Sequence, residues 1–189
     1  MTSRADAALQ TREALLDAGL DIAEQHGLAA MSVNRVVAAA GVAKGTFYVH
    51  FPDRGAFLNA LHQRFHEIVL GAVAKAMGGV EPGRDRLQRG METYLDSCLQ
   101  YNGVKAMLLE ARNDPAVSGK VAARTALFAA HAEPDLLAMG WTDTASAARL
   151  VVAMSAELSL VEQVRGERDP DGRAMLWQLL SRLDLGATS

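Results

Sequence analysis

The stretch SVNRVVAAAGVAKGTFYVHFPDR, residues 32–54, decides how the first part of this chain folds. Ser32 can cap a helix, apolar residues then recur at helical spacing, and Gly41 supplies the positive φ that ends many helices. Phe47 and Phe51 give a second short helix its inner face, and the proline that follows ends it. Two short helices joined by a tight turn predict a helix-turn-helix, whose second helix enters the major groove of DNA.

The outer arc of the second predicted helix carries side chains suited to DNA. They are short or form hydrogen bonds, so they can approach base edges and phosphates. The residues of this kind are Lys44, Gly45, Thr46, Tyr48 and His50. Paired short helices with a glycine turn also occur in all-α domains that bind no DNA, so spacing alone leaves both interpretations open.

Residues 41–58, GVAKGTFYVHFPDRGAFL, closely resemble the most characteristic stretch of the TetR family of bacterial repressors. The resemblance implies DNA binding, with base or phosphate contacts from Lys44, Gly45, Thr46, Tyr48 and His50. It implies a further phosphate contact from Arg54, where the family usually has Lys, at the start of the next helix. On the same resemblance, the helix that crosses the DNA backbone begins at Ser32, Val33 and Asn34.

Three positions depart from the family pattern. Ala43 stands where Ser or Thr usually caps the recognition helix, a change that removes about 1 kcal/mol of helix stability. Gly55 stands where the family prefers Glu and weakens the first turn of the next helix by up to about 1 kcal/mol. Arg35 replaces a residue that is often acidic. These departures affect the expected base preference more than DNA binding itself.

The composition favours helices and a core of useful size. The chain has 189 residues, of which 50% are hydrophobic and only 5% aromatic, enough for one or two small domains. Its formal net charge of −3 argues against a general polyanion binder, but residues 32–66 carry four Lys or Arg against one Asp. This local positive balance suits a shape-fitted contact with DNA.

We expect an all-α fold with about nine helices in two domains. Residues 1–52 would form a three-helix, helix-turn-helix DNA-binding domain, and residues 53–189 a helical domain for ligand binding and dimerisation. The first helix is predicted within residues 11–27, and a long helix runs from Asp53 to a glycine pair at 78–79. Glycine and proline, Pro134 among them, then separate helices predicted at residues 84–101, 104–113, 117–131, 143–166 and 170–184.

The last two predicted helices carry more apolar residues than one face can bury in so small a domain. In TetR-like proteins the last two helices form a four-helix dimer contact, and the resemblance implies the same here. The residues expected in it are Leu150, Met154, Leu158, Val161, Leu176, Leu179, Leu180 and Leu183. An intrachain core is the alternative for part of each surface. A homodimer would place two recognition helices about 34 Å apart to read a palindromic operator.

Methionine and aromatic residues on the middle helices suit a flexible apolar pocket. With two acidic residues in apolar surroundings, the candidates are Met91, Tyr94, Cys98, Met107, Glu110, Phe128, Trp141, Met154 and Glu157. The resemblance implies that this domain binds a small inducer, although each residue taken singly suits a plain core. The two acidic residues either pair with arginines such as Arg112 or Arg149, or face a cationic or hydroxyl-bearing ligand.

The sequence gives no sign of a cofactor, a metal or a membrane anchor. One cysteine cannot form an internal disulfide, the first residues lack an apolar signal segment, and no apolar run approaches about 18 residues. We therefore expect a cytoplasmic protein. His62 and His66 could hold a metal, but no further ligand lies at suitable spacing nearby, so a partly exposed helix face is the preferred interpretation.

These observations predict a TetR-like transcriptional regulator that is not an enzyme. We expect a homodimeric repressor of a palindromic double-stranded DNA operator, released when a small-molecule inducer fills the second domain. The alternatives are a DNA-binding regulator with no inducer pocket, and a small helical enzyme or carrier. The sequence has no Gly-rich phosphate loop, no H-E-x-x-H, no G-x-S-x-G and no paired Cys ligands, which disfavours an enzyme.

Overall fold

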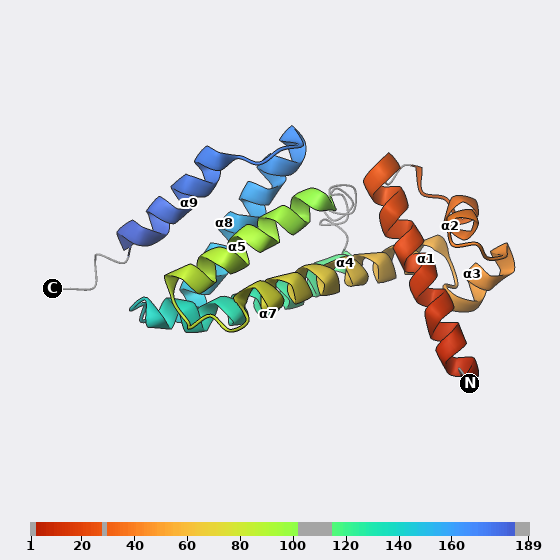
Figure 1. Ribbon diagram of the computed structural model, residues 1–189, viewed down its shortest axis with the longest axis horizontal. Coiled ribbons are helices and arrows are strands. Elements are labelled where there is room, and N and C mark those ends of the chain that lie inside the picture. The colour runs from red at the N-terminus through yellow and green to blue at the C-terminus, as the bar shows by residue number, and fades with distance from the viewer. Residues whose placement is uncertain (1–2, 28–29, 102–114, 184–189) are drawn as a thin grey trace. The chain divides into compact units, whose positions relative to one another are not determined.

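Helices joined by short turns make up the part of the chain that the structure, a computed structural model, describes: residues 3–27, 30–101 and 115–183 (Figure 1). No strand occurs in these ranges, which confirms the predicted all-α fold. The helices are α1 (Arg4–His26), α2 (Val33–Ala39), α3 (Lys44–His50), α4 (Arg54–Met77), α5 (Arg84–Gln100), α7 (Pro115–Ala138), α8 (Thr144–Arg165) and α9 (Pro170–Leu183). The described residues thus hold eight helices, and the expected count of nine is wrong for them. The helix predicted at 104–113 lies outside the described residues.

α1 begins at Arg4, earlier than the sequence pattern indicates, because two residues cap it reciprocally. The backbone N–H of Asp6 donates to Ser3 Oγ at 3.1 Å, and the backbone N–H of Ser3 donates to Asp6 Oδ2 at 2.9 Å. The hydrogen bond from the Ser3 backbone, with a smaller effect of its side chain, holds the pKa of the Asp6 carboxyl below its ordinary value. The helix ends at Gly27, as predicted, where φ is 69°.

The turn between α2 and α3 is set by Gly41, as the sequence predicts, with a φ of 68°. The N–H of Val42 donates to the Val37 carbonyl at 3.0 Å, and the N–H of Gly41 donates to the Ala38 carbonyl at 3.3 Å. These two bonds form a Schellman motif, which satisfies the last carbonyls of α2 while the chain turns into α3. α3 then begins without a side-chain cap, because Ala43 has no polar side chain to supply one.

Aromatic packing holds α3 in place. Phe47 and Phe51, the predicted inner face, are 0% and 3% exposed. Together with Phe57 of α4 they form a three-ring cluster, with ring centroids 5.0 to 5.5 Å apart. A helix of seven residues with no cap is not stable alone, so this cluster supplies the order that the recognition helix lacks by itself.

α1 and α4 approach each other closely at Gly19. A Cβ atom at this position would lie 2.7 Å from Phe57 Cζ and 3.1 Å from Leu61 Cδ1. The first distance is shorter than carbon atoms tolerate, so any side chain at position 19 would displace the Phe57 ring. The absent side chain of Gly19 therefore lets the two helices pack together.

α4 has the ends that the sequence predicts. The N–H of Ala56 donates to Asp53 Oδ1 at 2.7 Å, which caps the first turn, and Gly79 takes a φ of 73° just beyond the last turn. The chain forms two compact units, and the boundary between them falls within this helix. The first unit runs to Glu67, and the second begins at Ile68. The boundary suggested by the sequence, between residues 52 and 53, lies at the start of α4 and stays a prediction.

The second unit has a core formed by α5, α7, α8 and α9. Its buried residues include Leu87, Met91, Leu136, Ala148, Val151, Leu176 and Leu180. Trp141, Met154 and Leu158 are partly buried against this core. Each helix contributes residues three or four positions apart, the spacing that places side chains on one face.

α7 continues through Pro134, so the break predicted there is wrong. Proline cannot donate to the carbonyl four residues earlier, a loss of about 3 kcal/mol in a helix interior. Asp135 and Leu136, which follow the proline, are held by contacts with residues outside α7 or by burial. Leu136 is fully buried, and Asp135 Oδ1 accepts from the Gly83 N–H at 2.9 Å and from Arg86 Nε at 2.6 Å. These tertiary contacts stabilise the last turn of α7 against the effect of the proline.

α8 is the one helix in the described ranges that is long and apolar enough to cross a membrane, judged by length and composition. The core helix of a globular protein passes the same test. α8 also buries polar side chains against its own chain, namely Ser155, Ser159 and Glu162. These contacts are those of a helix packed within a protein.

Candidate nucleic-acid interface

The outer face of α3 presents the side chains that the sequence assigns to DNA. It consists of Lys44, Gly45, Thr46, Tyr48 and His50, of which Thr46 and His50 are half-buried and the others exposed. Tyr48 is 50% exposed, and its ring meets the Phe47 ring edge-on with 5.4 Å between centroids. α3 therefore combines a buried aromatic face with an accessible polar face.

Val49 belongs to the same surface, although the sequence-based site omitted it. It is 80% exposed, more than Leu9 at 59% or Tyr48 at 50% in the same unit. A branched alkyl group at this place can contact the C5 methyl of thymine in a major groove. Its position on the outer arc of the second predicted helix, next to Tyr48, could have identified it from sequence.

The start of α2 shows the cap that the sequence predicts. The backbone N–H of Arg35 donates to Ser32 Oγ at 3.3 Å. Ser32 and Asn34 are exposed, and Val33 is half-buried. The cap thus fixes the first turn of α2 with two polar side chains at its surface.

Two arginines hold the segment that enters α2. Arg54 Nε donates to the Met31 carbonyl at 3.2 Å, and an Arg35 terminal nitrogen donates to the Ala30 carbonyl at 3.4 Å. A guanidinium has five N–H donors, so these bonds leave others for a phosphate. The two positive charges therefore lie near the start of α2, an arrangement that sequence reasoning missed for Arg35.

The fold and this surface define a class of protein. A trio of helices with an aromatic core, a Schellman turn and an exposed polar second helix is the helix-turn-helix of a DNA-binding protein. Residues 15–61 match the family described as bacterial regulatory proteins, tetR family. Over these residues the chain resembles the DNA-binding region of TetR-family regulators.

Three known proteins illustrate the relationship. The HTH-type transcriptional repressor LfrR of Mycolicibacterium smegmatis is 33% identical over 87 residues, which are 46% of this chain and 45% of LfrR. An uncharacterized HTH-type transcriptional regulator of Mycobacterium tuberculosis is 28% identical over 166 residues, 86% of this chain and 79% of that protein. A TetR-family regulator structure from Rhodococcus sp. shares the fold, with a TM-score of 0.72 and 23% identity over 93% of this chain and 99% of that one.

The residues expected to bind a ligand are dispersed over the second unit. Met91, Tyr94 and Phe128 line a cavity of about 50 Å³, to which α4, α5, α7 and α8 contribute residues. Cys98 is buried in α5, and Trp141 and Met154 pack against the core. Glu157 is exposed on α8, whereas Met107 and Glu110 lie outside the described residues. Ligand binding by this set stays a prediction.

The residues expected at a dimer contact differ in their exposure within a single chain. Leu176 and Leu180 are 4% and 1% exposed within a single chain and belong to its core, the alternative that the sequence left open for part of each surface. Leu150 and Leu179 are 64% and 43% exposed and remain available to a partner. Met154, Leu158 and Val161 are half-buried, and the side chain of Leu183 lies outside the described residues.

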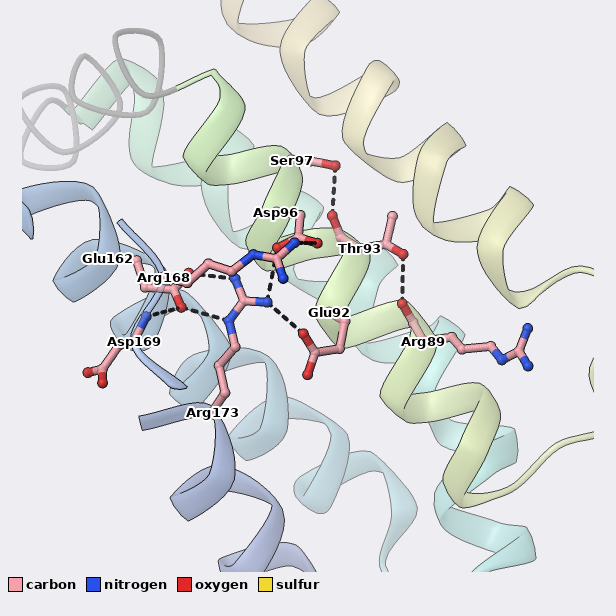
Figure 2. Close-up of polar contacts among 9 residues, drawn as sticks. All are labelled: Arg89, Glu92, Thr93, Asp96, Ser97, Glu162, Arg168, Asp169 and Arg173. Atoms are coloured by element: carbon pink, nitrogen blue, oxygen red, sulfur yellow. Dashed lines mark hydrogen bonds and ion pairs between the residues drawn. The ribbon is translucent and has the colours of Figure 1, made fainter. Parts of the chain in front are cut away.

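An ionic cluster centred on a buried arginine joins α5, α8 and α9, and sequence reasoning missed it (Figure 2). Arg173 of α9 is 6% exposed, and its Nε and one terminal nitrogen donate to the two carboxylate oxygens of Glu162 at 2.7 and 2.8 Å. Its other terminal nitrogen donates to Glu92 Oε2 at 2.6 Å and pairs with Asp96 Oδ1 at 3.0 Å. One guanidinium thus fixes three helices.

The cluster determines the ionisation of its members. Burial alone would raise the pKa of the Glu162 carboxyl, but hydrogen bonds from Arg173 and from the Asp169 N–H, with the charge of Arg173, hold that pKa below its ordinary value. The hydrogen bond to Glu162 likewise raises the pKa of Arg173. Both groups are therefore charged at neutral pH.

The histidine pair on α4 differs from its predicted setting. His62 is only 4% exposed, so the expectation of a partly exposed face is wrong for it. Its Nε2 lies 3.0 Å from His66 Nε2, a hydrogen bond in which one ring donates and the other accepts. Among the residues that the structure describes, no group of three or more possible metal ligands occurs.

Proposed function

We propose that this protein is a TetR-like homodimeric transcriptional repressor that binds a palindromic DNA operator through α3. The observation that carries the proposal is the division of α3 into two faces. Phe47 is fully buried on the inner face, while Tyr48 is half exposed on the outer face beside Lys44. A helix anchored by aromatic rings can enter a major groove without losing its packing.

The proposed contacts follow from the positions of the exposed polar groups. Lys44, Thr46 and His50 would meet base edges or the adjacent backbone. Tyr48 and Arg54 would meet phosphates, which fix the register of the protein on the duplex. Two protomers related by a two-fold axis would present their α3 helices about 34 Å apart, one turn of DNA.

Dimerisation is proposed through the outer surface of α8 and α9. Leu150 and Val164 of α8 are 64% and 81% exposed, and Met175 and Leu179 of α9 are 53% and 43% exposed. Exposed apolar side chains of this size gathered on two neighbouring helices are typical of a surface that a partner covers. A location in the cytoplasm, where DNA is accessible, accords with this role.

Release by a small molecule is the regulatory part of the proposal. A ligand in the second unit need only favour a dimer whose α3 helices no longer match successive major grooves. A coupling free energy of about 1–3 kcal/mol would lower operator affinity roughly 5- to 150-fold.

A regulator without an inducer is the second candidate, and the cavity size favours it. A cavity of about 50 Å³ holds little more than a few water molecules in the present packing. On this alternative, operator affinity depends on protein concentration alone, and no small molecule that binds the protein changes it.

The first experiment measures DNA binding by fluorescence anisotropy. The probe is the DNA immediately upstream of this protein's own coding sequence, titrated over a salt series with random DNA as control. Tight binding with two chains per site, and a large advantage over random DNA, is the expected result. Equal and weak binding to both DNAs would count against this operator, and selection from random DNA would then test α3 itself.

The matched variant is Tyr48→Ala. It should weaken operator binding by about 1–3 kcal/mol, because it removes an exposed contact group while Phe47 stays packed against Phe51 and Phe57. Tyr48→Phe keeps the ring and isolates the hydroxyl contribution, and Leu137→Ala, in α7, is the control outside the first unit. Sedimentation should show an unchanged dimer for all three. Undiminished binding by Tyr48→Ala, or a monomer, would contradict the proposal.

A further inference from the structure

The cavity in the second unit has a wall with a defined chemistry. Leu87, Met91, Phe128, Val151 and Val152 give it an alkyl and aromatic surface. Among the described residues that line it, none is Asp, Glu, Lys or Arg. An unpaired charge in such surroundings loses its hydration without compensation, so a cationic or anionic guest is disfavoured.

Two polar side chains in the wall, His131 and Ser155, can accept hydrogen bonds. His131 Nδ1 lies 2.9 Å from the Leu127 carbonyl oxygen, and because a carbonyl only accepts, Nδ1 carries the hydrogen. In the neutral ring Nε2 is then the acceptor. The Ser155 hydroxyl donates to the Val151 carbonyl at 2.8 Å, which leaves its oxygen lone pairs to accept.

We infer that this cavity takes a neutral aromatic molecule that carries a hydroxyl group, a phenol in its simplest form. The inference rests on the proposed ligand-regulated function and specifies its ligand. The ring matches the apolar wall, and the hydroxyl hydrogen matches the acceptors of His131 and Ser155. A site built to accept a hydrogen bond discriminates against analogues that lack the donor.

The cavity must enlarge to admit such a ring. Its volume is about 50 Å³, whereas a dry cavity of about 150 Å³ is the size that admits benzene. Met77 and Met91 line it, and methionine side chains change conformation more readily than branched ones. Met77 in particular occupies the space above Gly90, where a Cβ atom would lie 2.7 Å from its Sδ.

A substitution at Gly90 should therefore change the volume of the cavity through Met77. In Gly90→Ala the new methyl group must displace the flexible end of Met77, and both residues line the cavity. We expect the displaced side chain to occupy ligand space. The combined variant Gly90→Ala with Met77→Ala should restore that space.

The test is direct binding of four naphthalene derivatives to the full chain, measured by calorimetry without DNA. The probes are 2-naphthol, 2-methoxynaphthalene, the protonated 2-naphthylmethylamine and 2-naphthoate. 2-Naphthol should bind more tightly than the methyl ether by roughly three- to tenfold, the contribution of one hydrogen bond. The two charged probes should bind at least tenfold more weakly than 2-naphthol. Equal or tighter binding of either charged probe, or no binding of 2-naphthol, would overturn the inference.

Variants locate the site. Gly90→Ala should weaken 2-naphthol binding, the double variant with Met77→Ala should recover it, and Leu137→Ala on the exposed side of α7 should leave it unchanged. His131→Phe combined with Ser155→Ala should remove the preference for the hydroxyl while the methyl ether still binds. A preference that survives this pair would overturn the assigned acceptors.

Operator affinity is measured separately with and without saturating 2-naphthol. Binding of 2-naphthol with no change in operator affinity would contradict the proposed induction and leave the ligand chemistry standing. Loss of operator affinity together with the expected probe order would support both.

Discussion

Arg173 is the residue on which the second unit depends most directly. The Glu162 side chain beside it is 1% exposed, so its negative charge has almost no contact with water. In this setting the carboxylate relies on the guanidinium and on the Asp169 N–H, 2.9 Å from Glu162 Oε1. A buried ion pair of this kind contributes little compared with an apolar pair, but removal of one partner leaves the other charge uncompensated.

Replacement of Arg173 by Met should therefore lower the free energy of unfolding by about 3–5 kcal/mol at pH 7. Urea denaturation measures the change. Arg168→Met is the matched control, because Arg168 is 61% exposed and pairs with the partly exposed Asp96 at 2.7 Å. The control should lose at most about 1 kcal/mol. Similar losses for the two variants would contradict the assigned role of Arg173.

Acid should destabilise the protein through Glu162. Because the pKa of this carboxyl is lower in the folded state than its ordinary value, the stabilisation is present above the unfolded pKa, about 4.3, and is lost as pH falls through the folded pKa. Between pH 6 and 8, as approximate limits, Glu162 adds no pH dependence.

The measurement compares unfolding free energies at neutral and acid pH for two variants on α8. Glu162→Gln should show a shallower loss of stability toward acid than the wild type, because it lacks the carboxyl whose folded-state pKa is lowered. Glu157→Gln, at an exposed position of the same helix, should keep the wild-type dependence. If Glu162→Gln lost as much unfolding free energy toward acid pH as the wild type, the result would argue against the ion pair.

The stability of α3 depends mainly on packing and little on its own sequence. It has seven residues and no side-chain cap, and the backbone of Ala43 already has the extended conformation of an N-cap, φ −71° and ψ 150°. The aromatic cluster beneath it supplies the missing stability. Order in the recognition helix is thus tied to the integrity of the first unit's core.

Ala43→Ser should add the missing cap and stabilise α3 by about 1 kcal/mol. Slower hydrogen exchange of the first amides of α3 is the expected observation. Ala40→Ser, at the C-cap of α2, is the control, because a hydroxyl there meets no free N–H of a first turn. Equal protection in the wild type and Ala43→Ser would indicate that packing alone sets this helix end.

Local signals predicted these elements well, and tertiary contacts account for the errors. Gly41, Asp53 and the phenylalanines of α3 act within a few residues, so their effects are visible in sequence. Pro134 was misinterpreted because buried neighbours outweigh its local cost. Glu162 and Arg173 meet across a turn, and nothing in their spacing distinguishes them from ordinary surface charges.

At the scale of the whole molecule, helical periodicity identified apolar surfaces without telling which of them a partner covers. Leu179 and Leu180 are neighbours in sequence, yet one is 43% exposed and the other 1%. The position of α9 on its own core separates them, and sequence alone does not supply that position. The candidate DNA-binding face was easier to predict, because its exposed and buried residues alternate within one short helix.

Leu179→Arg should weaken the proposed homodimer, since an arginine within an apolar contact between protomers loses hydration without a partner. Analytical ultracentrifugation across a concentration range should show dissociation to monomers at concentrations where the wild type remains dimeric. Leu137→Arg, at a 68% exposed position of α7, is the matched control and should remain dimeric. Dissociation of the control alone would place the interface on α7 instead.

The close approach of α1 and α4 restricts the order in which this sequence can change over evolution. A larger residue at position 19 is tolerated only after Phe57 has become smaller, because the two would occupy the same space. A smaller residue at 57 first, however, opens a cavity in the ring cluster that holds α3. Either single step weakens the protein, so the pair should drift together or remain fixed.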